Sequence, residues 1–101
     1  NCQIENFVHV YSGSLMGHDS YTKNYCTIGA QSIVGGRVIL GEGVHVGFNA
    51  TIREDITVGK YSIVGMSSAV VKDITDFDIV GGNPAKSIKK KIFHSDLKSQ
   101  V

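Results

Sequence analysis

Residues 28–51 read, six at a time, IGAQSI, VGGRVI, LGEGVH and VGFNAT. Each unit opens on Ile, Val or Leu, carries Gly second, and has a small or β-branched fifth residue. The phase holds without insertion from Ile4 to Thr75, as twelve units of six residues. This period is neither helical nor a plain two-residue alternation. It predicts a solenoid in which every unit is a short strand followed by a turn.

Three units close one triangular coil, and coils stack at about 4.8 Å. The sequence predicts the coils 4–21, 22–39, 40–57 and 58–75, with each first residue pointing inward. We attribute the glycine at the second position to a turn conformation that a Cβ would obstruct. The predicted fold is an all-β, parallel β-helix of about four coils, which forms one domain over residues 1–80.

The period ends after Thr75. A last extended segment is predicted over residues 76–80, and a turn is predicted at Gly81-Gly82-Asn83-Pro84. From Ala85 to about Leu97 the apolar residues have helical spacing, which predicts a short helix. Because a solenoid needs a covered end, residues 81–101 are expected to form a turn and a helical cap.

The bulk properties exclude several classes. The 101 residues carry a net charge of +1, so the protein has no strong electrostatic field that would favour binding to nucleic acid or to a membrane surface. No apolar run of about 18 residues predicts a membrane span. Cys26 occupies an inward fifth position and is expected to be a free, buried thiol, which favours a reduced, cytoplasmic location. The chain opens on Asn1 with the repeat in phase from Ile4, so we expect a preceding N-terminal domain.

The hexads, the Gly17-His18-Asp19 turn, the Val34-Gly35-Gly36 turn and the closing Gly82–Lys86 segment resemble the hexapeptide-repeat acyltransferases. Within that superfamily the chain is most similar to sialic-acid O-acetyltransferases and UDP-amino-sugar N-acetyltransferases. The resemblance implies a left-handed parallel β-helix, in contrast to the usual right-handed crossover. It also implies a homotrimer with acetyl-CoA bound between neighbouring β-helices, and an N-terminal sugar-binding domain before the β-helix.

The candidate catalytic residues are His18, Asp19 and Gly36. Acetyl transfer needs a base for the acceptor's proton and a donor for the developing oxyanion. A histidine suits the first role, and the adjacent carboxylate of Asp19 is expected to hold the imidazole. Gly36 lies one full coil after His18, so the stacking places it over the imidazole and exposes its N–H. The family glycine at this position donates to the acetyl carbonyl, which makes Gly36 the oxyanion candidate.

The resemblance also suggests residues for the cofactor. Many relatives have a second histidine shortly after the first, near the thioester, where this chain has Thr27. The pantetheine is expected to contact mostly backbone. The cofactor candidates are Thr27, Gly36, Gly65, Met66, Asn83, Pro84 and Lys86. A metal site is not expected, because His9 and His45 lie two coils, about 10 Å, apart, whereas zinc–nitrogen bonds are about 2 Å long.

These observations predict an acetyl-CoA-dependent acetyltransferase that acts on an amine or hydroxyl of a sugar or nucleotide sugar, with His18 as general base. One alternative is the same chemistry on another small acceptor, such as an amino acid or a xenobiotic. A second is a non-catalytic β-helix that only trimerises and presents a partner domain. Binding of acetyl-CoA separates the enzyme from the scaffold.

Overall fold

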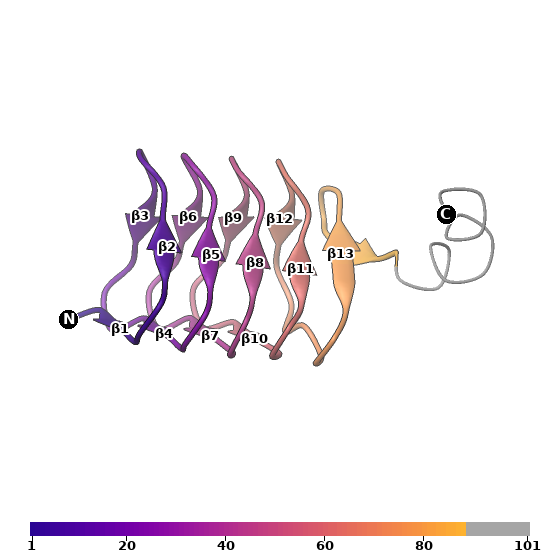
Figure 1. Ribbon diagram of the computed structural model, residues 1–101. Coiled ribbons are helices and arrows are strands. Elements are labelled where there is room, and N and C mark those ends of the chain that lie inside the picture. Colours follow the sequence, from indigo (N-terminus) through magenta and orange to yellow (C-terminus); the bar gives the residue numbers. More distant parts are fainter. Residues whose placement is uncertain (89–101) are drawn as a thin grey trace.

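The fold was obtained as a computed structural model, which describes residues 1–88. These residues wind into a stack of coils made of short strands (Figure 1), and none of them lies in a helix. Accordingly, the described part of the chain contains no helix that could cross a membrane. The strands are β1 Gln3–Ile4, β2 His9–Val10, β3 Leu15–Met16, β4 Tyr21–Thr22, β5 Thr27–Ile28, β6 Ile33–Val34, β7 Ile39–Leu40, β8 His45–Val46, β9 Thr51–Ile52, β10 Thr57–Val58, β11 Ile63–Val64, β12 Ala69–Val70, β13 Ile79–Gly81 and β14 Lys86–Ser87.

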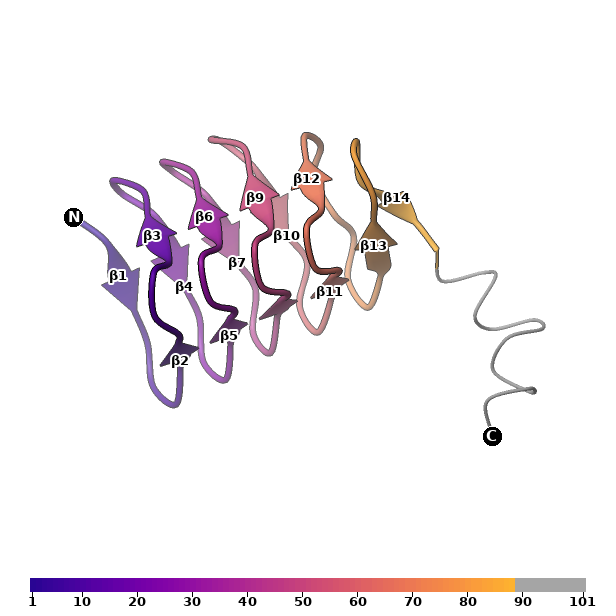
Figure 2. The same cartoon turned by 90° about the horizontal axis from the view of Figure 1, so that it is seen from above.

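Three sheets form the faces of the β-helix, and Figure 2 shows them from above. Face A contains β1, β4, β7 and β10; face B contains β2, β5, β8, β11, β13 and β14; face C contains β3, β6, β9 and β12. The first coils pair in parallel with an offset of three hexads, as in Thr22 with Leu40 and Ile28 with Val46. The predictions of an all-β fold and of about four stacked coils are therefore confirmed.

The core is the set of first and fifth residues of the hexads. Ile28, Leu40 and Val46 are fully buried, whereas Ile4, in the first coil, is 47 % exposed. Burying a large aliphatic side chain contributes about 1.5–3 kcal/mol, so these columns hold the coils together. Two polar fifth residues are satisfied across coils: the hydroxyl of Ser32 donates to the carbonyl of Gly47 at 2.9 Å, and that of Ser62 donates to the carbonyl of Thr75 at 2.8 Å. The buried hydroxyls of Ser20 and Ser68 have no hydrogen-bond partner among the described residues.

The glycines at the second position of the hexad are required, but for a different reason from the one predicted. The left-handed backbone falls at the fourth residue of the hexad, with φ near +60° at Gln31 and Asn49, not at the second. A Cβ on Gly35 would instead come within 2.5 Å of the backbone N of Glu54, and one on Gly29 within 2.5 Å of the backbone N of Phe48. These glycines are required because neighbouring coils approach closely there.

The fourth coil is shorter than predicted. Val58 pairs with Ile74 and Val64 with Val80, two positions short of a full coil, whereas Val70 keeps the full-coil offset from Ile52. The unit predicted over 70–75 is therefore shortened, and Ile74 takes a first position, not a fifth. The carboxylate of Asp73 accepts the N–H of Thr57 at 2.9 Å, which replaces the backbone carbonyl that the missing positions would have supplied.

The segment after the last turn pairs as a strand where the prediction placed the start of a helix. The chain turns at residues 82–85 and returns as β14, with Val80 opposite Ser87 and Gly81 opposite Lys86. The hydroxyl of Ser87 also donates to Asp78 at 2.7 Å. Pairing satisfies the N–H and C=O groups that β13 would otherwise leave open at the edge of face B. The remainder of the predicted helix, residues 89–97, lies outside the described residues.

Candidate active site

His18 lies at the corner where each coil passes from face C to face A. We call the turns at this corner, residues 17–20, 35–38 and 53–56, the His18 corner. The fourth residue of each hexad here has a left-handed backbone, with φ of 57° at Asp19 and 59° at Arg37. The N–H of Arg37 donates to the carbonyl of His18 at 2.8 Å. Hydrogen bonds of this kind align the three turns, so their side chains form vertical columns.

The imidazole of His18 contacts the carboxylate of its neighbour. Nδ1 of His18 lies 3.3 Å from Oδ2 of Asp19, and the two side chains are about two-thirds exposed, 65 and 64 %. The hydrogen bond from His18 lowers the pKa of Asp19. An ionised carboxylate at this place favours the tautomer with hydrogen on Nδ1. The contact leaves Nε2 free to accept a proton.

Gly36 lies directly against the imidazole. A Cβ on Gly36 would come within 2.6 Å of Nε2 and 2.9 Å of Cδ2 of His18. Contacts this short require a shift of the ring, so the present position of His18 depends on a glycine here. Among residues 1–88, the hydrogen bonds of the turn use the carbonyl of Gly36, which accepts from Asp55, and leave its N–H free to donate. The structure thus brings together the two residues that the stacking of coils places over one another.

An ion pair next to this site was missed by the sequence reasoning. Arg37 binds Asp55 through two hydrogen bonds, Nε to Oδ1 at 2.5 Å and a terminal guanidinium nitrogen to Oδ2 at 2.9 Å. This bond raises the pKa of Arg37 and lowers the pKa of Asp55. The signal was present in the sequence: Asp19, Arg37 and Asp55 recur once per coil, at the same hexad position, with alternating charge.

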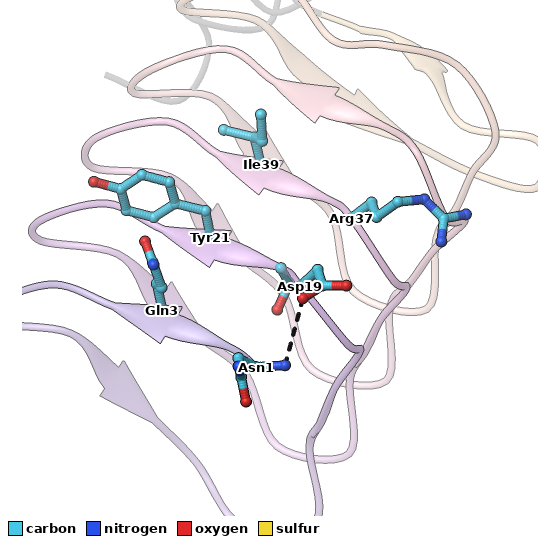
Figure 3. A pocket seen from close by; sticks show the side chains of 7 residues that line it. Asn1, Gln3, Asp19, Tyr21, Arg37 and Ile39 are labelled. Atoms are coloured by element: carbon cyan, nitrogen blue, oxygen red, sulfur yellow. Dashed lines mark hydrogen bonds and ion pairs between the residues drawn. The ribbon is translucent and has the colours of Figure 1, made fainter.

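A shallow groove adjoins the His18 corner on face A (Figure 3). It measures about 510 Å³ and lies over strands β1, β4 and β7. The residues lining it are Asn1, Gln3, Asp19, Ser20, Tyr21, Arg37 and Ile39. The groove therefore shares Asp19 with the His18–Asp19 pair, and its wall combines polar and apolar side chains.

Most of the cofactor candidates lie away from the His18 corner of the same chain. Gly65 and Met66 line a second groove, of about 300 Å³, together with His45, Phe48 and Ile63, where face B turns toward face C. Thr27 lies on face B, paired with His9 on one side and His45 on the other. Within one chain, only Gly36 of these candidates meets His18.

The three candidates near the end of the described chain form a separate group. Asn83 and Pro84 lie in the turn after β13, and Lys86 belongs to β14. All three are exposed. They lie at the opposite end of the stack of coils from His18. A ligand that touches both His18 and these residues would therefore have to run along the stack.

The sequence has relatives of known activity. Residues 19–54 match the family model described as bacterial transferase hexapeptide (six repeats). A chloramphenicol acetyltransferase from Klebsiella aerogenes is 37% identical over 62 residues, which cover 61% of this chain and 30% of that protein. A dTDP-3-amino-3,6-dideoxy-alpha-D-galactopyranose 3-N-acetyltransferase from Aneurinibacillus thermoaerophilus is 39% identical over 51 residues, 50% of this chain and 27% of that protein. The chain thus spans less than a third of the length of these two relatives.

Solved structures share the fold. WeeI from Acinetobacter baumannii AYE superposes with a TM-score of 0.85 at 28% identity, over 87% of this chain and 44% of that chain. A mutant of perosamine N-acetyltransferase from Caulobacter crescentus, in complex with CoA and GDP-perosamine, has a TM-score of 0.75 at 23% identity, over 85% of this chain and 52% of that chain. The chain is therefore a hexapeptide-repeat β-helix that resembles acetyltransferases, sugar N-acetyltransferases among them.

Proposed function

We propose that this chain is the β-helical part of an acetyltransferase that moves an acetyl group from acetyl-CoA to an amine or hydroxyl of a sugar or nucleotide sugar. The observation that carries the proposal is the arrangement of His18, with Nδ1 on the carboxylate of Asp19 and the ring against Gly36. An exposed turn histidine without a role would require neither partner. The sequence similarity to named acetyltransferases gives independent support.

The geometry suggests a division of roles. With hydrogen on Nδ1, Nε2 of His18 accepts the proton of the acceptor amine or hydroxyl as that group attacks the thioester carbonyl. Asp19 holds the ring and stabilises the imidazolium that forms. When the carbon–sulfur bond breaks, the proton on Nε2 passes to the departing sulfur. The products are the acetylated acceptor and CoA, and His18 is neutral again.

Gly36 supplies the second requirement of this chemistry. Its N–H is free of partners among residues 1–88, and the side of its Cα where a side chain would stand faces Nε2 of His18. A hydrogen-bond donor fixed by the backbone stabilises the oxyanion without having to reorganise during the reaction. Removing one such donor in an enzyme typically costs about 10²–10³ in kcat. We therefore propose that the N–H of Gly36 faces the carbonyl oxygen of the acetyl group.

The donor site is proposed to lie between subunits of a homotrimer. Gly65, Met66 and Thr27 lie at other edges of the chain than His18, so a single copy does not gather them around one ligand. A neighbouring copy that presents this edge to the His18 corner would complete the site. Lys86, Asn83 and Pro84 would then contact the distal part of acetyl-CoA. The proposed location is the cytoplasm, which fits the two free cysteines.

The acceptor has a second candidate. One relative acetylates a sugar amine by its name, which favours a nucleotide sugar. The similarity to chloramphenicol acetyltransferase favours instead a hydroxyl on a xenobiotic. Both acceptors use the same base and the same oxyanion donor, so the roles of His18, Asp19 and Gly36 do not depend on the choice.

A turnover assay tests the proposal. Acetyl-CoA is mixed with the purified protein and a panel of amino sugars, nucleotide amino sugars and chloramphenicol, and the release of free CoA thiol is followed. We expect turnover with at least one acceptor, and a loss of about 10²–10⁴-fold in His18→Ala. The matched control is His9→Ala. It removes an exposed histidine of face B, outside the His18 corner, and should leave the rate unchanged.

Two results would contradict the proposal. Unchanged turnover in His18→Ala would remove His18 from its role. Absence of turnover together with no heat on titration of acetyl-CoA would favour a β-helix that only assembles. The oligomeric state, measured by light scattering, tests the trimer separately.

A further inference from the structure

The charged column of the His18 corner contains one cation between two carboxylates. Asp19, Arg37 and Asp55 occupy the same position in three successive turns, with φ of 57°, 59° and 62°. Successive coils are about 4.8 Å apart. The backbone of Arg37 is held by its hydrogen bond to His18, and that of Asp55 by its hydrogen bond to Gly36. The long side chain of Arg37 therefore has a carboxylate within reach on either side.

Arg37 pairs with only one of them. Its guanidinium binds Asp55 in a fork, at 2.5 and 2.9 Å. In Figure 3 the side chain of Arg37 extends away from Asp19. The carboxylate of Asp19 is left to the imidazole of His18, at 3.3 Å, and to the backbone nitrogen of Asn1. The direction of Arg37 thus decides which groups Asp19 can bind.

We propose that Asp55 is a positioning residue, which ties up Arg37 and so keeps Asp19 available to His18. The inference rests on the proposed role of His18. Without the carboxylate of Asp55, Arg37 turns to Asp19. A forked guanidinium–carboxylate pair is stronger than the single, long hydrogen bond that the imidazole makes to Asp19. Asp19 then no longer holds the ring, and its charge is neutralised beside His18.

Stability is a poor alternative explanation of the Arg37–Asp55 pair. Both side chains are half exposed, 50 and 57 %. Exposed ion pairs typically contribute little to the free energy of unfolding, because water screens them and two long side chains must be ordered. A function through Asp19 accounts for the fork and for its direction.

The electrostatic consequence has a definite sign. The charged side chains that face this corner, besides His18, are Asp19, Asp55, Glu54, Arg37 and Arg53. Replacing Asp55 by Asn removes one negative charge and lets Arg37 neutralise a second, Asp19. Both changes disfavour the imidazolium form of His18. His18 is therefore expected to take the proton of the acceptor less readily.

The test compares Asp55→Asn with Arg37→Gln/Asp55→Asn, and uses Glu54→Gln as the matched control. The control removes an equal charge from the adjacent residue but leaves the fork to Arg37 intact. In Asp55→Asn we expect kcat/KM to fall about fivefold, the effect of about 1 kcal/mol, which is the interaction of two charges at about 4 Å in water. The acid limb of the pH profile should move to lower pH. Both changes should be largely reversed in the double variant and small in Glu54→Gln.

A second readout does not depend on turnover. The NMR signal of a carbon-bound ring proton of His18, assigned by its absence in His18→Gln, is followed as a function of pH in the same variants. Its midpoint should fall in Asp55→Asn and return in the double variant, and Asp55→Glu, which keeps a carboxylate, should behave like the parent protein. If the midpoint does not change in Asp55→Asn, or if the double variant behaves like the single one, the positioning role is wrong. If the NMR pattern holds while no acceptor turns over, the proposed function fails and the role of Asp55 in holding Arg37 stands.

Discussion

Two corners of the β-helix have the same backbone conformation but differ in their side chains, which are charged at one corner and aromatic at the other. At the His18 corner the fourth residues of the hexads are charged. At the corner between face A and face B they are aromatic except for Gly43, with Phe7 stacked on Tyr25 at 5.3 Å and Tyr61 on Phe77 at 5.7 Å. We call this second corner the aromatic corner; its column is Phe7, Tyr25, Gly43, Tyr61 and Phe77.

The backbone at the two corners is the same in detail. Tyr25 and Tyr61 have φ of 65° and 56°, and their N–H groups donate to Asn6 and Glu42 of the previous turn, as Arg37 does to His18. Each corner also has a glycine that lies against a ring: a Cβ on Gly43 would lie 2.4 Å from the ring of Tyr61, although Gly43 stands at the fourth position with φ of 71°. The repeat therefore specifies the frame at every corner. The chemistry depends on which side chains stand on it.

The largest effect on stability is expected where glycine lets two coils approach. Gly35→Ala puts a Cβ 2.5 Å from the backbone N of Glu54, and backbone cannot move aside as a side-chain tip can. Overpacking of this kind costs about 1–3 kcal/mol. Urea unfolding measures it. Lys23→Ala, at a second position that already carries a side chain, should change the free energy of unfolding by less than about 0.5 kcal/mol. Equal stability of the two variants would contradict the close approach.

A smaller effect on stability is expected at the aromatic corner. Phe77→Ala removes the ring that stacks on Tyr61 and lies near the ammonium of Lys60. Such aromatic pairs are worth about 0.5–1.5 kcal/mol, and this one is half exposed, so the lower part of that range applies. Phe77→Tyr keeps the ring and is the control. Turnover per folded molecule should be unchanged in both, and a loss of turnover in Phe77→Ala would mean that the two corners are not separate in function.

Much of the frame could be predicted, because the hexad period in the sequence fixes which residues point inward. The shortened fourth coil could not be predicted from it. Ile74 satisfies the pattern in the fifth position as well as in the first, and the two are distinguished by its pairing with Val58 and by the hydrogen bond from Thr57 to Asp73. The predicted helix from Ala85 failed at its start for a related reason. The spacing of apolar residues carries no information about the open edge of β13, which the chain covers by pairing with β14.

The candidate site could be predicted in part for the same reason. A spacing of one full coil is enough to place Gly36 over His18, since both belong to the same corner. The spacing also contained Arg37 and Asp55, but the direction of the arginine depends on side-chain geometry. The contacts proposed for Thr27, Gly65 and Met66 depend on how one chain meets another, which no spacing within a chain contains.

The central claim, that the coil joins His18 and Gly36 into one site, is tested most directly by Gly36→Ala. The backbone of Gly36 lies outside the left-handed region, and the three atoms nearest to the added Cβ belong to the exposed ring of His18, which can swing away. Gly43→Ala is the comparison at the aromatic corner, where backbone strain at φ of 71° adds to the clash with the ring of Tyr61. We predict that Gly36→Ala unfolds at nearly the same urea concentration as the parent and loses about 10²-fold or more in kcat, the scale of one lost catalytic group. Gly43→Ala should lose stability and keep kcat. Full turnover in a folded Gly36→Ala protein would contradict the account.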